Sequence, residues 1–234
     1  MRKKSICIMV FSIALVLLVL TGCGSEAEKA MDEAVTTANE LLDNNKNKPL
    51  DPKTKTDLKR AVKNSEEADD DDAYKKATEE ITAATKAFED SVKQLKQVTK
   101  PKEEFLVERA KTVKTVTKVE AATEKTDGNK MLHKEGGYTS YIAMKSSMVK
   151  DDFYNDQSAV EAGCDGGAVI EAFKTTKEAK KREEYLAGFD GNGMLDSGSH
   201  KVVGTLLVRT SNELTATQQK QLEKNIIEAL TRLE

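Results

Sequence analysis

The sequence predicts an α+β protein in two parts: an N-terminal three-helix bundle, then a small α+β sandwich of helices on a three- or four-stranded sheet. Residues 25–100 contain no glycine and are rich in alanine, lysine and acidic residues, a composition that favours helices. After Pro101, glycines and β-branched runs become frequent, which favours strands and turns. We therefore expect the bundle at residues 27–98 and the α+β domain at residues 102–234.

The first 22 residues have the pattern of an export signal. Three basic residues, Arg2, Lys3 and Lys4, precede an apolar stretch from Ile6 to Leu20. These are the n-region and the h-region of a signal peptide. The stretch has fifteen residues, whereas a transmembrane helix needs about 20. An uncleaved membrane anchor is the alternative.

The four residues Leu20, Thr21, Gly22 and Cys23 resemble the lipobox of bacterial prelipoproteins. The resemblance implies cleavage between Gly22 and Cys23 and a diacylglycerol in thioether linkage on Cys23. Residues 1–22 would then be the signal peptide, and residues 23–26 the lipidated N-terminus and tether. Acyl chains on one cysteine give stable anchoring once two or more are present. The expected location is the extracytoplasmic face of a cell membrane, and the composition leans toward a Gram-positive cell.

Cysteine content and charge are consistent with this interpretation. Cys7 leaves with the signal peptide and Cys23 is lipidated, so Cys164 remains alone and no intramolecular disulfide can form. Removing Arg2, Lys3 and Lys4 changes the formal net charge from −3 to −6. An acidic chain is not expected to bind nucleic acid.

Three amphipathic stripes predict the helices of the bundle. The first spans Ala27–Leu42, the second spans Lys53–Asn64, and the third carries apolar residues every three or four positions from Ala77 to Leu95. Each stripe needs another to cover it, which favours an up-down-up bundle. The run Asp69–Asp72 lacks the ligand spacing of a calcium loop and is expected to cap the third helix.

The segment Ala27–Leu95, "AMDEAVTTANELLDNN…LKRAVKNSEEADDDDAYKKATEEITAATKAFEDSVKQL", is similar to the FIVAR-type three-helix modules of Gram-positive surface adhesins, some of which are called extracellular-matrix-binding proteins. The resemblance covers about a third of the chain and involves one such unit. It implies a cell-surface spacer or binding module. The alternative is a plain stalk that holds the second domain off the membrane.

In the second part, the pattern predicts the order helix, strand, strand, helix, strand, helix. A helix is expected at Lys102–Glu124, and strands are expected in "GGYTSYIAMKSS", "GGAVIEAFK" and "HKVVGTLLVRTS", the last of them central. Capping boxes at Thr175 and Thr215 predict the two remaining helices. Together these elements suit helices packed on a small sheet.

Catalytic chemistry is not expected in this domain. Cys164 could pair with His133 or His200 as a nucleophile and base, but no local motif frames the cysteine. The segment with Asp190, Asn192 and Asp196 lacks the closing acid of a calcium loop. We expect no metal site, no cofactor and no enzyme activity.

The remaining expectation is a function by location and architecture. The first hypothesis is a lipid-anchored binding or adhesion-type surface protein whose partner is an extracellular protein or a wall polymer. Aromatic residues mark recognition surfaces, so its candidate recognition residues are Tyr138, Tyr141 and Tyr154. The second hypothesis is a structural or assembly partner of an envelope complex, which an apolar outer face on the bundle would favour. The third is a thiol enzyme that uses Cys164.

Overall fold

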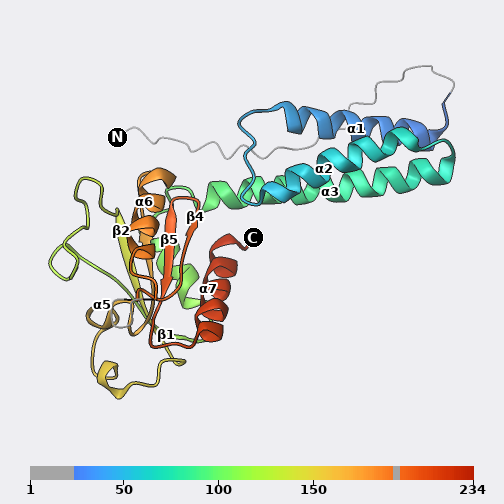
Figure 1. Ribbon diagram of the computed structural model, residues 1–234. Coiled ribbons are helices and arrows are strands. Elements are labelled where there is room, and N and C mark those ends of the chain that lie inside the picture. The colour runs from blue at the N-terminus through green and yellow to red at the C-terminus, as the bar shows by residue number, and fades with distance from the viewer. Residues whose placement is uncertain (1–23, 192–195) are drawn as a thin grey trace, which may run out of the picture.

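The computed structural model describes residues 24–191 and 196–234. The predicted lipidation and cleavage site at Gly22 and Cys23 lies outside the described residues, as does Asn192. Figure 1 shows a helical bundle that projects from an α+β domain, which confirms the predicted fold class. No helix in the described part of the chain combines the length and apolar character needed to cross a membrane.

Three helices form the bundle. They are α1 (Glu26–Asp43), α2 (Pro52–Asn64) and α3 (Asp71–Gln97), with the short 3₁₀ turn η1 (Ser65–Glu67) between the last two. The side chains of Ser25, Asp51 and Asp70 cap them by accepting backbone N–H groups of the first turns. Asp70 confirms that the aspartate run caps the third helix. The core is one thin apolar layer, with Leu58, Ile81 and Phe88 fully buried.

The described residues of the α+β domain form five strands and four α-helices. The strands are β1 (Val116–Ala121), β2 (Ser140–Ser146), β3 (Gly167–Ala172), β4 (His200–Val203) and β5 (Leu206–Thr210). The helices are α4 (Glu103–Lys111), α5 (Ala159–Ala162), α6 (Thr176–Ala187) and α7 (Ala216–Thr231), and η2 (Asp152–Tyr154) is a 3₁₀ turn. The strands pair antiparallel in the order β1-β2-β3-β5-β4.

Two parts of the predicted element order are wrong. The expected helix at residues 102–124 ends at Lys111, and its β-branched second half forms β1 and pairs with β2. The expected third strand divides at Gly204, whose φ of 64° allows the turn between β4 and β5. The sheet therefore has five strands rather than three or four, and its central strand is β3.

The sheet has an apolar core on each face (Figure 1). On one face, α4 and α7 pack against Ile142, Ile170 and Val208. On the other face, α5 and α6 pack against Tyr141, Val169 and Leu207. Successive residues of one strand therefore point alternately into the two cores.

The end of α3 is fastened to the α+β domain. Val98 is fully buried in the core beneath α4 and α7, and its carbonyl accepts the Thr205 N–H at 3.1 Å. The Gln97 side-chain amide donates to the Leu230 carbonyl at 2.7 Å, at the end of α7. Lys100 N–H donates to the Thr205 hydroxyl at 2.8 Å. The bundle thus joins the domain through buried contacts at the β4–β5 turn.

Candidate functional site

The three tyrosines proposed for recognition occupy different environments. Tyr138 is fully buried and Tyr141 is 6% exposed, with their ring centroids 5.3 Å apart. Both belong to the apolar core beneath α5 and α6. The expected tyrosine surface is therefore absent at these two positions, because Tyr141 projects from β2 into this core and Tyr138 packs within it. Of the three, only Tyr154, in η2, reaches the surface.

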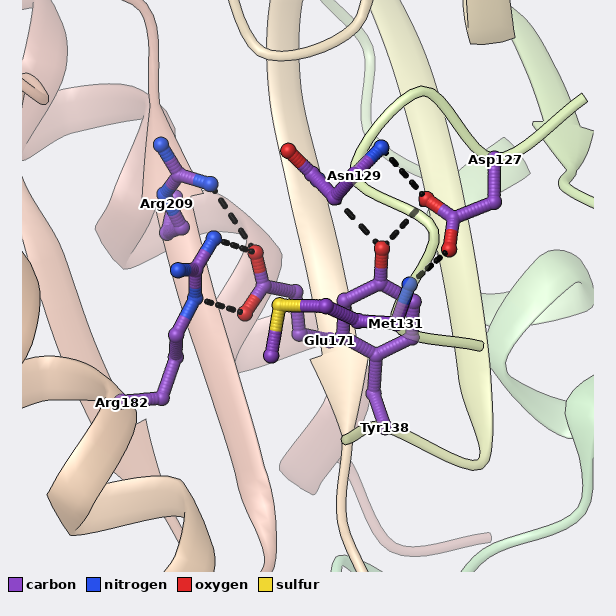
Figure 2. Close-up of polar contacts among 7 residues, drawn as sticks. All are labelled: Asp127, Asn129, Met131, Tyr138, Glu171, Arg182 and Arg209. Carbon is purple, nitrogen blue, oxygen red and sulfur yellow. Dashed lines mark hydrogen bonds and ion pairs between the residues drawn. The ribbon is translucent and has the colours of Figure 1, made fainter. Parts of the chain in front are cut away.

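Asp127 explains how the Tyr138 hydroxyl can be buried. Its carboxylate accepts that hydroxyl at 2.5 Å and the backbone N–H groups of Asn129, Met131 and Leu132 at 2.7–3.1 Å (Figure 2). Burial raises the pKa of Asp127, but these hydrogen bonds outweigh it and leave the pKa below its ordinary value. Each oxygen of the carboxylate accepts two of these hydrogen bonds, so Asp127 fixes the loop at residues 122–139.

A second polar network surrounds Glu171 on β3 (Figure 2). The Glu171 carboxylate is fully buried and accepts Arg182 Nε of α6 at 3.0 Å and Arg209 Nη1 of β5 at 2.9 Å. Arg182 Nη2 adds a further bond at 3.3 Å. Both oxygens of the carboxylate are paired, so this network holds three elements together rather than acting as an acid or base.

Cys164 lies near enough to this network for the charges of Arg209, Glu171 and Arg182 to act on its thiol. Burial raises the pKa of its thiol to about 11, which keeps the thiol protonated near neutral pH. Within the described residues, His133 bonds to Glu124 and the Thr139 carbonyl, and His200 bonds to Asp190. Neither histidine has a hydrogen bond to Cys164 there. The pairing of Cys164 with His133 or His200 that the sequence allows is therefore not seen among the described residues.

Among the residues that the structure describes, the most exposed aromatic residue lies next to Tyr154. Phe153 is 71% exposed, and its ring meets that of Tyr154 edge to face at a centroid distance of 5.3 Å. The loop that carries both is fixed to β2, because the Lys145 ammonium donates to the carbonyls of Tyr154, Asn155 and Gln157 at 2.6–3.1 Å. These three bonds use every donor of the ammonium group. This aromatic loop, residues 147–158, is our candidate recognition site.

Sequence reasoning identified Tyr154 but missed Phe153 and Lys145. The local sequence "DDFYND" does carry a signal, since two adjacent aromatic residues stand among aspartates and asparagine with no apolar periodicity. Such a pattern favours a loop in which an aromatic side chain is exposed.

Two shallow hollows lie on the surface of the α+β domain. One, of about 250 Å³, lies over the loop of Asp127 and is lined by Glu124, Lys125, Lys130 and Lys134 among others. The other, of about 490 Å³, lies between α4 and α7 and is lined by Thr112, Asn225, Glu228 and Arg232 among others. In the part of the chain that the structure describes, no group of three or more His, Cys, Asp or Glu residues could hold a metal ion.

Comparison of the chain with protein-family models, with curated proteins and with solved structures found no match.

Proposed function

We propose that this protein is a lipid-anchored, extracytoplasmic binding protein of the adhesion type, without catalytic activity. Cys23 carries the diacylglycerol, the bundle lifts the α+β domain off the membrane, and that domain binds an extracellular protein or a wall polymer. The resemblance of Leu20–Cys23 to a lipobox and the likeness of the bundle to adhesin modules support this proposal.

The observation that carries the proposal is the position of the helix that follows Cys23. Its cap, Ser25, comes two residues after the cysteine, so little chain separates the lipid from α1. Figure 1 shows α1 starting at the end of the bundle that is remote from the sheet, and α3 running back to the α+β domain. The 27 residues of α3 span about 40 Å at 1.5 Å per residue. A lipid on Cys23 would therefore put the anchor and the domain at opposite ends of the bundle, as the proposal requires.

The exposed aromatic residues favour binding by the α+β domain over an assembly role for the bundle. Among the described residues, the large hydrophobic side chains that are exposed are Phe153 and Tyr185, and both belong to the α+β domain. Recognition surfaces are enriched in such aromatic side chains. Assembly through the outer face of the bundle is the second candidate, but the described bundle residues carry no exposed large hydrophobic side chain to favour it.

The first test compares wild-type cells with cells carrying Cys23→Ala, using membrane fractionation and the intact mass of the membrane-bound protein. We expect the wild-type mass to match a chain that starts at Cys23 and carries a diacylglycerol. The Cys23→Ala variant should be uncleaved or shed. Cys164→Ala is the matched control, because it removes the other cysteine of the mature chain and should leave the lipidated mass intact. A wild-type protein that retains residues 1–22 would contradict the proposal.

A further inference from the structure

Three loops of the α+β domain meet at the end of the sheet opposite the bundle. The register places Ala172 of β3 beside Leu206, next to the bundle junction, and places Gly167 beside Lys145 at the other end. The aromatic loop follows β2 at that second end, where the gold η2 turn lies in Figure 1. The loops at residues 163–166 and 211–215 lie at the same end, because the first precedes β3 and the second follows β5.

Hydrogen bonds hold these loops together. The Ser211 hydroxyl donates to the Asp165 carbonyl at 2.9 Å, and Ser211 N–H donates to the Gly167 carbonyl at 2.8 Å. Lys145, one strand away, holds the aromatic loop through its three carbonyl contacts. Phe153 and Tyr154 are therefore presented by a fixed surface, so their binding would cost little ordering entropy.

The charges around this aromatic pair are mainly negative. Each of the three loops contributes a carboxylate whose negative charge acts on Tyr154, namely Asp151, Asp165 and Glu213. Burial first, and then the negative charge of these groups, raises the pKa of Tyr154. The Lys145 ammonium is occupied by carbonyls, and Lys150 donates to the Ser147 carbonyl at 2.8 Å. Asp165 and Glu213 are both exposed and have no ion pair among the contacts of the described residues. Partial burial of its carboxyl group raises the pKa of Asp165, and the positive charge of Arg209 opposes that rise.

We propose that this loop end of the α+β domain, with Phe153 and Tyr154 set among Asp151, Asp165 and Glu213, docks a lysine- or arginine-containing segment of a partner protein. The inference rests on the proposed binding function and names the chemistry of the partner. A cationic head group is attracted both by the carboxylates and by the faces of the two rings. The aliphatic stem of lysine or arginine packs on an exposed ring such as Phe153.

The test measures binding of two fluorescent peptides to the detergent-purified, membrane-bound protein by fluorescence anisotropy. One peptide repeats lysine and alanine, and the other repeats glutamate and alanine. We expect binding of the lysine peptide alone, weakening as salt is added. Phe153→Ala should weaken it about three- to fivefold through loss of the ring contact. The double variant Asp165→Asn with Glu213→Gln should weaken it about three- to tenfold and reduce the dependence on salt.

The matched control is the double variant Asp69→Asn with Asp72→Asn, which makes the same change of net charge at the start of α3 in the bundle. We expect its affinity for the lysine peptide to stay within about twofold of wild type. All substituted side chains are exposed, so denaturant unfolding should show that each variant folds. Equal binding of both peptides, or equal loss in the bundle control and the loop variant, would overturn the inference. The peptide assay measures binding at the loops, whereas the Cys23→Ala experiment measures lipid anchoring. Failure of this inference can therefore be distinguished from failure of the proposed lipid anchoring.

Discussion

In the bundle, ion pairs lie on the surface along single helices, whereas in the α+β domain the central ion network is buried and joins three elements. Asp90 pairs with Lys86 at 2.6 Å and Lys93 at 3.3 Å, both on its own helix. Glu171 instead reaches from β3 to α6 and β5. The ion pairs of Asp90 therefore lie within one helix, whereas those of Glu171 help to fix how separate elements of the domain pack together.

The apolar cores differ in the same way. The bundle buries a thin layer that includes small residues such as Ala38 and Ala61, so any of its helices depends mainly on its two neighbours. The α+β domain buries two layers, one on each face of the sheet. A sheet that is covered on both faces is a rigid support for the loops at its ends. The aromatic loop follows β2 at one of these ends. The bundle is suited to setting distance, and the domain is suited to presenting a surface.

The largest expected effect is that of Glu171→Gln. The substitution leaves the largely buried Arg182 and Arg209 without the carboxylate that pairs with them, and breaking a buried pair typically costs about 3–5 kcal/mol. Urea denaturation at neutral pH, followed by circular dichroism, measures this loss directly. A loss below about 1 kcal/mol would show that the network is not needed to assemble the domain.

Asp90→Asn is the corresponding change in the bundle. Its carboxylate is partly exposed, and exposed ion pairs contribute about 0–1 kcal/mol. We expect a loss of that size, which shrinks further when salt is added. Equal losses for Asp90→Asn and Glu171→Gln would remove the contrast between the two regions.

The next largest effect tests the junction between the two regions. Gly204 and Gly136 both have positive φ, at 64° and 72°. A Cβ at Gly204 would lie 2.4 Å from the Val98 carbonyl oxygen, whereas at Gly136 it would meet nothing within 4 Å. Alanine at either site costs about 1–2 kcal/mol for its backbone conformation. Gly204→Ala should cost about 1–3 kcal/mol more, because Val98 must move.

Denaturation of the two alanine variants measures this difference, and small-angle X-ray scattering of each shows whether the bundle separates from the domain. We expect the radius of gyration to increase for Gly204→Ala and to stay unchanged for Gly136→Ala. Identical unfolding curves for the two variants would mean that the close contact with Val98 does not hold the bundle in place.

The helices of the bundle were predictable because their cores follow a local period. Ile81, Phe88 and Val92 recur at helical spacing, and burial of all three follows from that spacing alone. Strand β1 was not predictable in this way. Val116 and Val119 continue a spacing compatible with a helix from Phe105, and only pairing with a partner about 25 residues later, in β2, selects the strand.

The candidate site was predictable only in part, because exposure is a tertiary property. Tyr138 could be buried because Asp127 accepts its hydroxyl, and Phe153 is exposed because Lys145 fixes its loop at the end of the sheet. Neither partner is adjacent to its aromatic residue in a recognisable motif. The buried network left a clearer sign, since Glu171 and Arg209 interrupt otherwise apolar segments on strands that turn out to be neighbours.

The last comparison separates a buried tyrosine from a surface tyrosine. Tyr138→Phe removes the hydroxyl that Asp127 and Asn129 contact, which should cost about 1–2 kcal/mol near neutral pH. Tyr154→Phe is the control and should change stability by less than about 0.5 kcal/mol. Urea denaturation of both variants measures these losses.

Lowering the pH should then reduce the cost of Tyr138→Phe. The folded-state pKa of Asp127 lies below its ordinary value of 3.8, so the ionised carboxylate contributes stability that is fully present above that value. That contribution is lost as the pH falls through the lowered folded-state pKa, because Asp127 then becomes protonated. The hydrogen bond from Tyr138 to a neutral carboxyl group is weaker than the bond to a carboxylate. The free-energy difference between wild type and Tyr138→Phe should therefore be smaller near the acid limit of folding than at neutral pH, and a difference that grows on acidification would contradict the role assigned to Asp127.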